Sequence, residues 1–182
     1  MSTTTSADAK ERGDVSLLEF LDLSQLDCLN EDSAHTLKSI LAQKTRNTSA
    51  SYLASDADEQ LILNIPFNQS VRVRSIVIHG SNPTQAPRAI KLAVNRPTLG
   101  FEDVEDAKEP EVAQILSLSQ ADVMEGRPVA LRFVRFQAVN SLHIFVGSNH
   151  GDEDTTRIDA IDIFGVPVET TKDLSGLRKQ DE

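Results

Sequence analysis

Two short acidic segments gather side chains that could bind a cation or a basic partner. Asp56-Ala-Asp-Glu59 holds three carboxylates, and Asp152-Glu-Asp154 holds three in a row. Calcium prefers oxygen ligands in flexible geometry, so either segment is a candidate calcium site. Neither follows the order of an EF-hand, with its glycine in mid-loop and its terminal glutamate. The alternative, which we favour, is that these Asp side chains accept hydrogen bonds from nearby backbone N–H groups in turns. We therefore expect no bound metal and no cofactor.

The cysteine and the histidines offer little catalytic chemistry. Cys28 is the single cysteine, and its neighbours Leu26 and Leu29 favour a small buried side chain over an activated thiolate. No pair of histidines has the HxxxH or HxH spacing that most simply places two imidazoles on one metal; they are His35, His79, His143 and His150. Hydrolase and nucleotide-binding motifs are absent. We expect no catalytic residue, and His143 on the polar face of a strand.

Alternating apolar residues predict the strands that must position these loops. The alternation is clear over 60–67, 89–95 and 139–146, and it returns between Ile158 and Gly165. The pairs Val71/Val73 and Ile76/Ile78 differ in parity, which predicts a bulge near Arg74-Ser75 or burial of both faces. Residues 131–136 also suggest a strand, with a switch of parity in its middle. Many short strands predict an all-β antiparallel sandwich or barrel.

The N-terminal part of the chain is less regular. We expect 15–29 to form an irregular apolar arm around the barrel, with a plain amphipathic helix as the alternative. Asp32 or Ser33 could cap a short helix that runs to about Gln43. Residues 1–14 are expected to be a disordered leader, 15–168 the folded domain and 169–182 a flexible tail.

Composition excludes several classes of partner. The 182 residues carry a formal net charge of -10, which opposes binding to phosphate backbones, so we expect no nucleic-acid partner. No apolar run approaches the length of a membrane span, and the N-terminus has no signal-peptide core. A single cysteine suits a reducing compartment. We expect a protein of the cytoplasm and nucleus that makes no membrane contact.

Four motifs in chain order resemble the PITH domain, the proteasome-interacting thioredoxin domain. They are Cys28-Leu-Asn-Glu31, Ser55-Asp-Ala-Asp-Glu-Gln-Leu61, residues 131–140 and residues 139–168. The resemblance implies a jelly-roll β-sandwich similar to galactose-binding and anaphase-promoting-complex Doc domains. It also implies a non-enzymatic module that docks on the proteasome regulatory particle. Well-known members carry a thioredoxin domain upstream, and here we expect a stand-alone, monomeric PITH domain.

The candidate partner-binding residues lie in two loops that we expect at one end of the sandwich, Ser55–Gln60 and Ser148–Arg157. Their polar, non-periodic composition is better explained by contacts than by packing. They are Asp56, Asp58, Glu59, Gln60, Asn149, His150, Asp152, Glu153, Asp154 and Arg157. The alternative is that Asp56, Asp58 and Arg157 form an internal network that only shapes the loops.

Arg72 and Arg74 form a second candidate face, because residues two apart on a strand point the same way. Its alternative is the ordinary polar side of an antiparallel sheet. For the whole domain, the competing function is a small-ligand or carbohydrate-binding module. Aromatic residues make up only 4% of the chain and tryptophan is absent, which counts against stacking on sugars.

Overall fold

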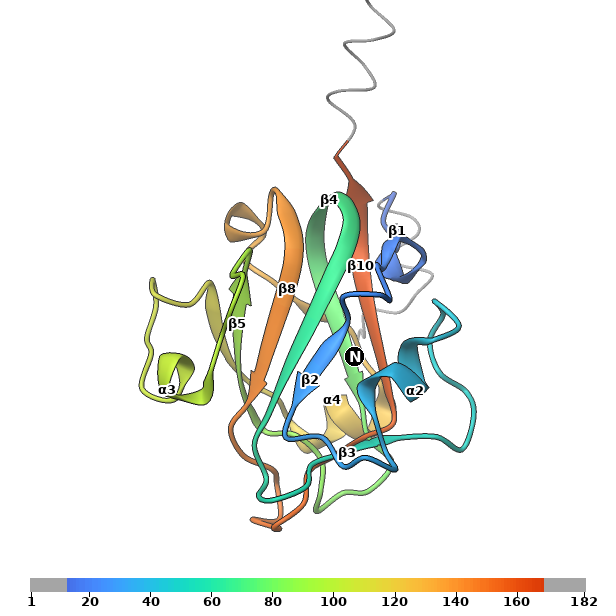
Figure 1. The fold of residues 1–182 in the computed structure, drawn as a ribbon, viewed down its shortest axis with the longest axis vertical. Coiled ribbons are helices and arrows are strands. Elements are labelled where there is room, and N and C mark those ends of the chain that lie inside the picture. The colour runs from blue at the N-terminus through green and yellow to red at the C-terminus, as the bar shows by residue number, and fades with distance from the viewer. Residues whose placement is uncertain (1–12, 169–182) are drawn as a thin grey trace, which may run out of the picture.

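One long, bent strand organises the domain. The computed structural model describes residues 13–168, so the predicted tail and nearly all of the predicted leader lie outside the described residues. The bent strand is β4 (Leu61–His79). Its first part pairs antiparallel with β8 (Val139–Val146), and its second part pairs antiparallel with β10 (Ala160–Pro167) (Figure 1). Since β4 serves two sets of neighbours, the sheet curls over onto itself.

The strand order of the curled sheet is β1-β10-β4-β8-β5-β6, and β2 and β7 also pair with β4. The remaining strands of this sheet are β1 (Val15–Ser16), β2 (Asp27–Leu29), β5 (Ala89–Val94), β6 (Gln114–Ser117) and β7 (Val129–Ala130). A separate antiparallel pair joins β3 (Leu53–Ala54) to β9 (Arg157–Ile158). All these pairings are antiparallel, which confirms the prediction of an all-β fold.

The core is filled by aliphatic side chains from the inner faces of these strands. Leu63 of β4, Ile144 of β8 and Ile163 of β10 are fully buried. Ile62 and Phe145, which have the opposite parity, are also buried, in a second cluster with Leu99. Burial on both faces explains why the apolar runs of β4 and β8 are nearly continuous.

The change of parity within 71–78 corresponds to a bulge, the first of the two predicted alternatives, and Ser75 and Val77 on the other face are buried as well. Ser75 lies opposite Phe164 and Val73 lies opposite Gly165, so Arg74 is the additional residue. An extra residue in one strand shifts every later side chain to the other face.

The N-terminal arm contains a 3-10 helix, η1 (Leu17–Phe20), whose Leu17 and Leu18 are buried. The predicted short helix exists as α2 (Leu37–Leu41). Its start differs from the prediction: Thr36 caps it by accepting a hydrogen bond from the Ser39 N–H at 3.2 Å, whereas Asp32 accepts from Ala34 in the preceding turn. No helix within 13–168 is long and apolar enough to cross a bilayer.

Three further helical segments were not predicted. They are α3 (Phe101–Val104), α4 (Gln120–Glu125) and the 3-10 turn η2 (Phe133–Arg135). The prediction of a strand over 131–136 is therefore wrong. Leu131 and Phe136 are buried and hold the segment down, while the residues between them turn outwards into solvent.

Candidate functional site

The two predicted loops lie together at one end of the sandwich. The Ser55 N–H donates to the Thr156 carbonyl at 3.0 Å, and the Thr156 N–H donates to the Ser55 hydroxyl at 2.9 Å. The Thr156 hydroxyl donates in turn to the Glu59 carbonyl at 2.7 Å. Ser55 and Thr156 are both buried, so these bonds form a protected joint between the loops. We name the surface made by residues 55–60 and 148–157 the loop end.

Two of the candidate side chains, the buried Asn149 and the exposed Asp58, make hydrogen bonds within the domain that shape the loop end. Asn149 is 1% exposed; its amide nitrogen donates to the Glu153 carbonyl at 3.0 Å, and its amide oxygen accepts from the Glu153 N–H at 2.8 Å. One Asp58 carboxylate oxygen accepts from the Gln60 N–H at 3.0 Å and from the Asn30 amide at 2.9 Å. In each case the side chain bonds backbone N–H or C=O groups of the loop that have no partner in a strand or helix.

Arg157 does not pair with Asp56 or Asp58. Its guanidinium lies 3.7 Å from the ring centroid of Tyr52 and pairs with Asp159 at 2.9 Å. His35 stacks on the same Tyr52 ring at 4.0 Å. Two groups this close to one ring must lie on opposite faces, so both faces of Tyr52 are covered.

Four acidic side chains of the loop end point into solvent instead. Asp56, Asp152, Glu153 and Asp154 are exposed, and within 13–168 their carboxylates make no hydrogen bond or ion pair. Across the same described residues, no three His, Cys, Asp or Glu side chains are grouped to hold a metal ion. The exposed carboxylates therefore form a patch of uncompensated negative charge, which favours a basic partner surface.

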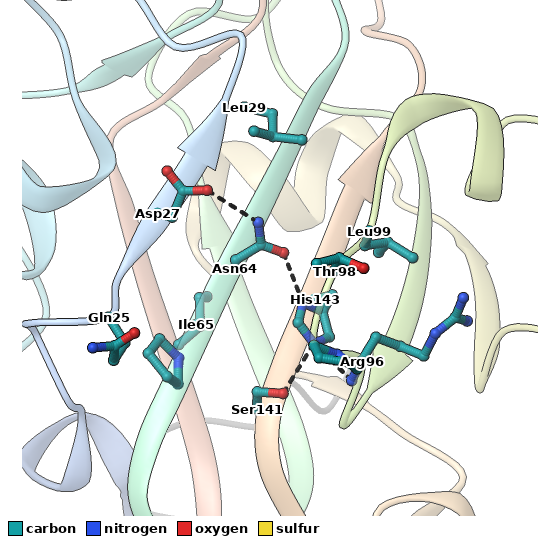
Figure 2. A pocket seen from close by; sticks show the side chains of 12 residues that line it. Gln25, Asp27, Leu29, Asn64, Ile65, Arg96, Thr98, Leu99, Ser141 and His143 are labelled. Carbon is teal, nitrogen blue, oxygen red and sulfur yellow. Dashed lines mark hydrogen bonds between the residues drawn. The ribbon is translucent and has the colours of Figure 1, made fainter.

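A second site, missed by the sequence analysis, is a hollow of about 600 Å³ between β2, β4, β8 and residues 96–99 (Figure 2). At its floor, the His143 ring nitrogen Nδ1 lies 2.7 Å from the Asn64 amide oxygen. The other ring nitrogen, Nε2, lies 3.2 Å from the Arg96 N–H and 2.9 Å from the Ser141 hydroxyl. An amide oxygen only accepts and a backbone N–H only donates, so His143 is neutral, with its proton on Nδ1.

This arrangement of Ser141, His143 and Asn64 resembles a hydrolytic triad, but it is poorly suited to that chemistry. Burial and, to a lesser extent, the nearby Arg96 charge lower the pKa of His143 to about 4. A general base works best when its pKa lies near the working pH. In addition, Nε2 already accepts the Arg96 N–H. The chain of hydrogen bonds instead ties the Arg96 backbone to His143 of β8 and Asn64 of β4. His143 has the polar neighbours that we predicted, but it is buried.

The Arg72 and Arg74 side chains are exposed on one face of β4, as their spacing predicts. Arg74 Nε lies 3.3 Å from the Asp14 carboxylate, while Arg72 has no ion pair within 13–168. This face lies next to η2, at the end of β8 opposite to the loop end, because η2 precedes Val139 and the loop 147–156 follows Val146.

The curled antiparallel sheet has the fold of the galactose-binding-like β-sandwiches. In structural comparison, the chain is similar to the family 32 carbohydrate-binding module of Clostridium perfringens NanJ, solved in complex with galactose. The TM-score is 0.58 at 9% identity, over 83% of this chain and 98% of that one. At this identity the likeness shows the fold alone.

The model of the PITH domain family matches residues 7–182, and the chain belongs to this family. It is 41% identical over 167 residues to Thioredoxin-like protein 1 of Schizosaccharomyces pombe, covering 90% of this chain and 56% of that protein. It is 34% identical over 151 residues to PITH domain-containing protein CG6153 of Drosophila melanogaster, covering 82% and 69%. The chain thus spans little more than half the length of the first of these relatives.

Proposed function

We propose that this chain is a non-enzymatic protein-interaction module that docks on the proteasome regulatory particle through its loop end. The observation that carries the proposal is membership of the PITH family, from which proteasome docking is inferred. The loop end supports it, since Asp56, Asp152, Glu153 and Asp154 present charge that no described group neutralises. The expected counterpart is a basic surface of the regulatory particle.

The competing function is carbohydrate binding, suggested by the similar modules of known structure. The neighbourhood of Tyr52 counts against it. An aromatic face is a common platform for sugars, and both faces of the single tyrosine are occupied, by His35 and Arg157. Phe133 is then the one aromatic side chain that is mainly exposed among the described residues. A panel of sugars in a thermal-shift assay separates the two functions, because a ligand that binds only the folded state raises Tm. A docking module should give no shift in Tm with any sugar. A clear rise in Tm with one sugar would favour carbohydrate binding over proteasome docking.

The docking proposal is tested by the double charge reversal Glu153→Lys/Asp154→Lys. Binding to purified 26S proteasome would be measured by surface plasmon resonance at several salt concentrations. We expect slower association and a weaker dependence on salt, because exposed interfacial charges act mainly on the association rate.

The matched control is Glu102→Lys/Asp106→Lys, which changes net charge equally at two exposed positions near α3. The control should bind like the unmodified chain. Normal binding of the folded Glu153→Lys/Asp154→Lys protein would show that the loop end is not the docking surface. No binding by the unmodified chain would refute proteasome docking itself.

A further inference from the structure

The most exposed large apolar side chains of the described residues are adjacent. Phe133 is 58% exposed and Val134 is 68% exposed, both in η2. A pair of large apolar side chains that costs solubility and contributes nothing to the core suggests contact with another molecule.

The turn that presents them is rigidly held. Its flanking residues Leu131 and Phe136 are buried. The Leu131 N–H donates to the Arg74 carbonyl at 2.8 Å, and the Val73 N–H donates to the Phe136 carbonyl at 3.0 Å. Because both ends of the turn are bonded to β4, the backbone that carries Phe133 and Val134 is held in place, which lowers the backbone entropy lost on binding.

Basic side chains surround this apolar pair. Arg132 and Arg135 flank it in the sequence, and Arg72 and Arg74 line a hollow of about 130 Å³ together with Phe133. Arg132 pairs with Glu109 and Arg74 pairs with Asp14. Arg72 has no ion-pair partner among the described residues. Arg135 makes no direct ion pair there and donates to the Pro110 carbonyl at 3.2 Å. The hydrogen bond from the Ile115 N–H lowers the pKa of Glu109, and the charge of Arg135 helps that of Arg132 to lower it further.

An excess of cations here runs against the character of the whole chain, whose net charge is -10. Arginine is also the cation best suited to interfaces, because its planar group binds carboxylates through two hydrogen bonds and is weakly hydrated. The complementary ligand therefore carries carboxylates around an apolar side chain.

We propose that Phe133, Val134, Arg72 and Arg135 form a second docking surface, which binds a short segment of another protein with an apolar residue flanked by Asp or Glu. The apolar side chain of the bound segment would pack on Phe133 and Val134. The carboxylates of the flanking Asp or Glu residues would point to Arg72 and Arg135. This surface lies opposite to the loop end and does not depend on proteasome docking. The domain would thus bind a basic partner at one end and an acidic segment at the other.

The test is selection from a random 12-residue phage-display library on the full chain, followed by fluorescence anisotropy of the labelled peptides. Enriched peptides should place an apolar residue among acidic ones. Phe133→Ser and Arg72→Glu should each weaken their binding about tenfold or more, which is the range of interface hot spots. Affinity for the unmodified chain should fall with added salt.

Matched controls are Ile115→Ser, at another exposed apolar residue, and Arg88→Glu, at another exposed arginine. Both should retain peptide affinity, and all variants should keep their Tm, since the altered side chains are exposed. The proposal is overturned by failure to enrich such peptides or by equal affinity in Phe133→Ser. It is also overturned if sedimentation shows a self-associated chain that Phe133→Ser dissociates, because the occupant would then be a second copy.

Discussion

Gly165 lies so close to Arg72 that a Cβ atom on Gly165 would be 1.8 Å from the Arg72 carbonyl oxygen. Gly165 is paired with Val73 at the bulge, where β10 approaches the bent part of β4. The contact is with backbone, which cannot move aside as a side-chain end can. The bulge sets the direction in which the Arg72 and Arg74 side chains point, so Gly165 indirectly positions both arginines.

We expect Gly165→Ala to lower the free energy of unfolding by about 2 kcal/mol or more, as overpacking does at rigid sites. Urea denaturation measures this. Gly147→Ala is the matched control, since its new methyl would meet the tip of the Phe145 ring at 3.2 Å and would cost less. Equal stability of the two variants would mean that β10 can shift away from β4 without penalty.

A second prediction separates the residues that shape the loop end from those that face a partner. Asn149→Ala should cost roughly 2 kcal/mol, because the buried Asn149 amide makes three hydrogen bonds to the backbone of Glu153 and Thr155. Asp154→Ala should change stability by less than about 0.5 kcal/mol, as exposed substitutions do. Guanidinium denaturation of both proteins measures the difference. Comparable losses would show that Asp154 is also part of the internal framework.

The structure confirms that Cys28 is buried, and we predict that its thiol is unreactive. Burial raises the pKa of the Cys28 thiol, and the charges of Glu31 and Asp27 raise it further. Because the thiolate is the reactive form, labelling by iodoacetamide at pH 8 should be slow in the folded protein and fast in urea. Mass spectrometry follows the labelling. Rapid modification without urea would indicate an accessible thiolate and would revive a redox role.

A fourth prediction concerns acid. The pKa of His143 is about 4 in the folded protein against 6.5 ordinarily, so the unfolded chain binds the proton first as pH falls. His143 therefore contributes stability above about pH 6.5 that is lost progressively down to about pH 4 and not recovered below it. The loss is roughly 3 kcal/mol at most.

Two measurements check the behaviour of His143. In an NMR titration, its imidazole signals should show no protonation down to about pH 5. Unfolding experiments should show that His143→Gln flattens the dependence of stability on pH between 6.5 and 4. Protonation of the His143 imidazole in the folded protein at pH 6 would contradict the assignment of a neutral ring hydrogen-bonded to Asn64 and Arg96.

Local patterns were sufficient for much of the fold. The alternation over 60–67, 89–95 and 139–146 predicted β4, β5 and β8, because a strand places successive side chains on opposite faces wherever it pairs. The parity change at Arg74-Ser75 predicted the bulge for the same reason. The PITH motifs predicted the family and, through it, the sandwich.

Periodicity failed where neighbouring elements decide the conformation. Residues 131–136 contain β-branched and aromatic side chains but form a 3-10 turn, because buried Leu131 and Phe136 are fixed to β4 at both ends. Likewise, α2 begins after Thr36 and not near Asp32, whose carboxylate is used in the turn before it.

By itself, the sequence determined the long strands β4, β5, β8 and β10, where the two acidic loops fall, and that the chain carries an excess of negative charge. Only the tertiary structure decided which polar residues face inwards: Asn64 meets His143 across 79 positions, and Ser55 meets Thr156 across 101. The physical reason is that alternation is a property of each strand alone. A side-chain hydrogen bond, in contrast, depends on which strands become neighbours, so Asn149 and Asp154 look alike in the sequence and differ in the fold.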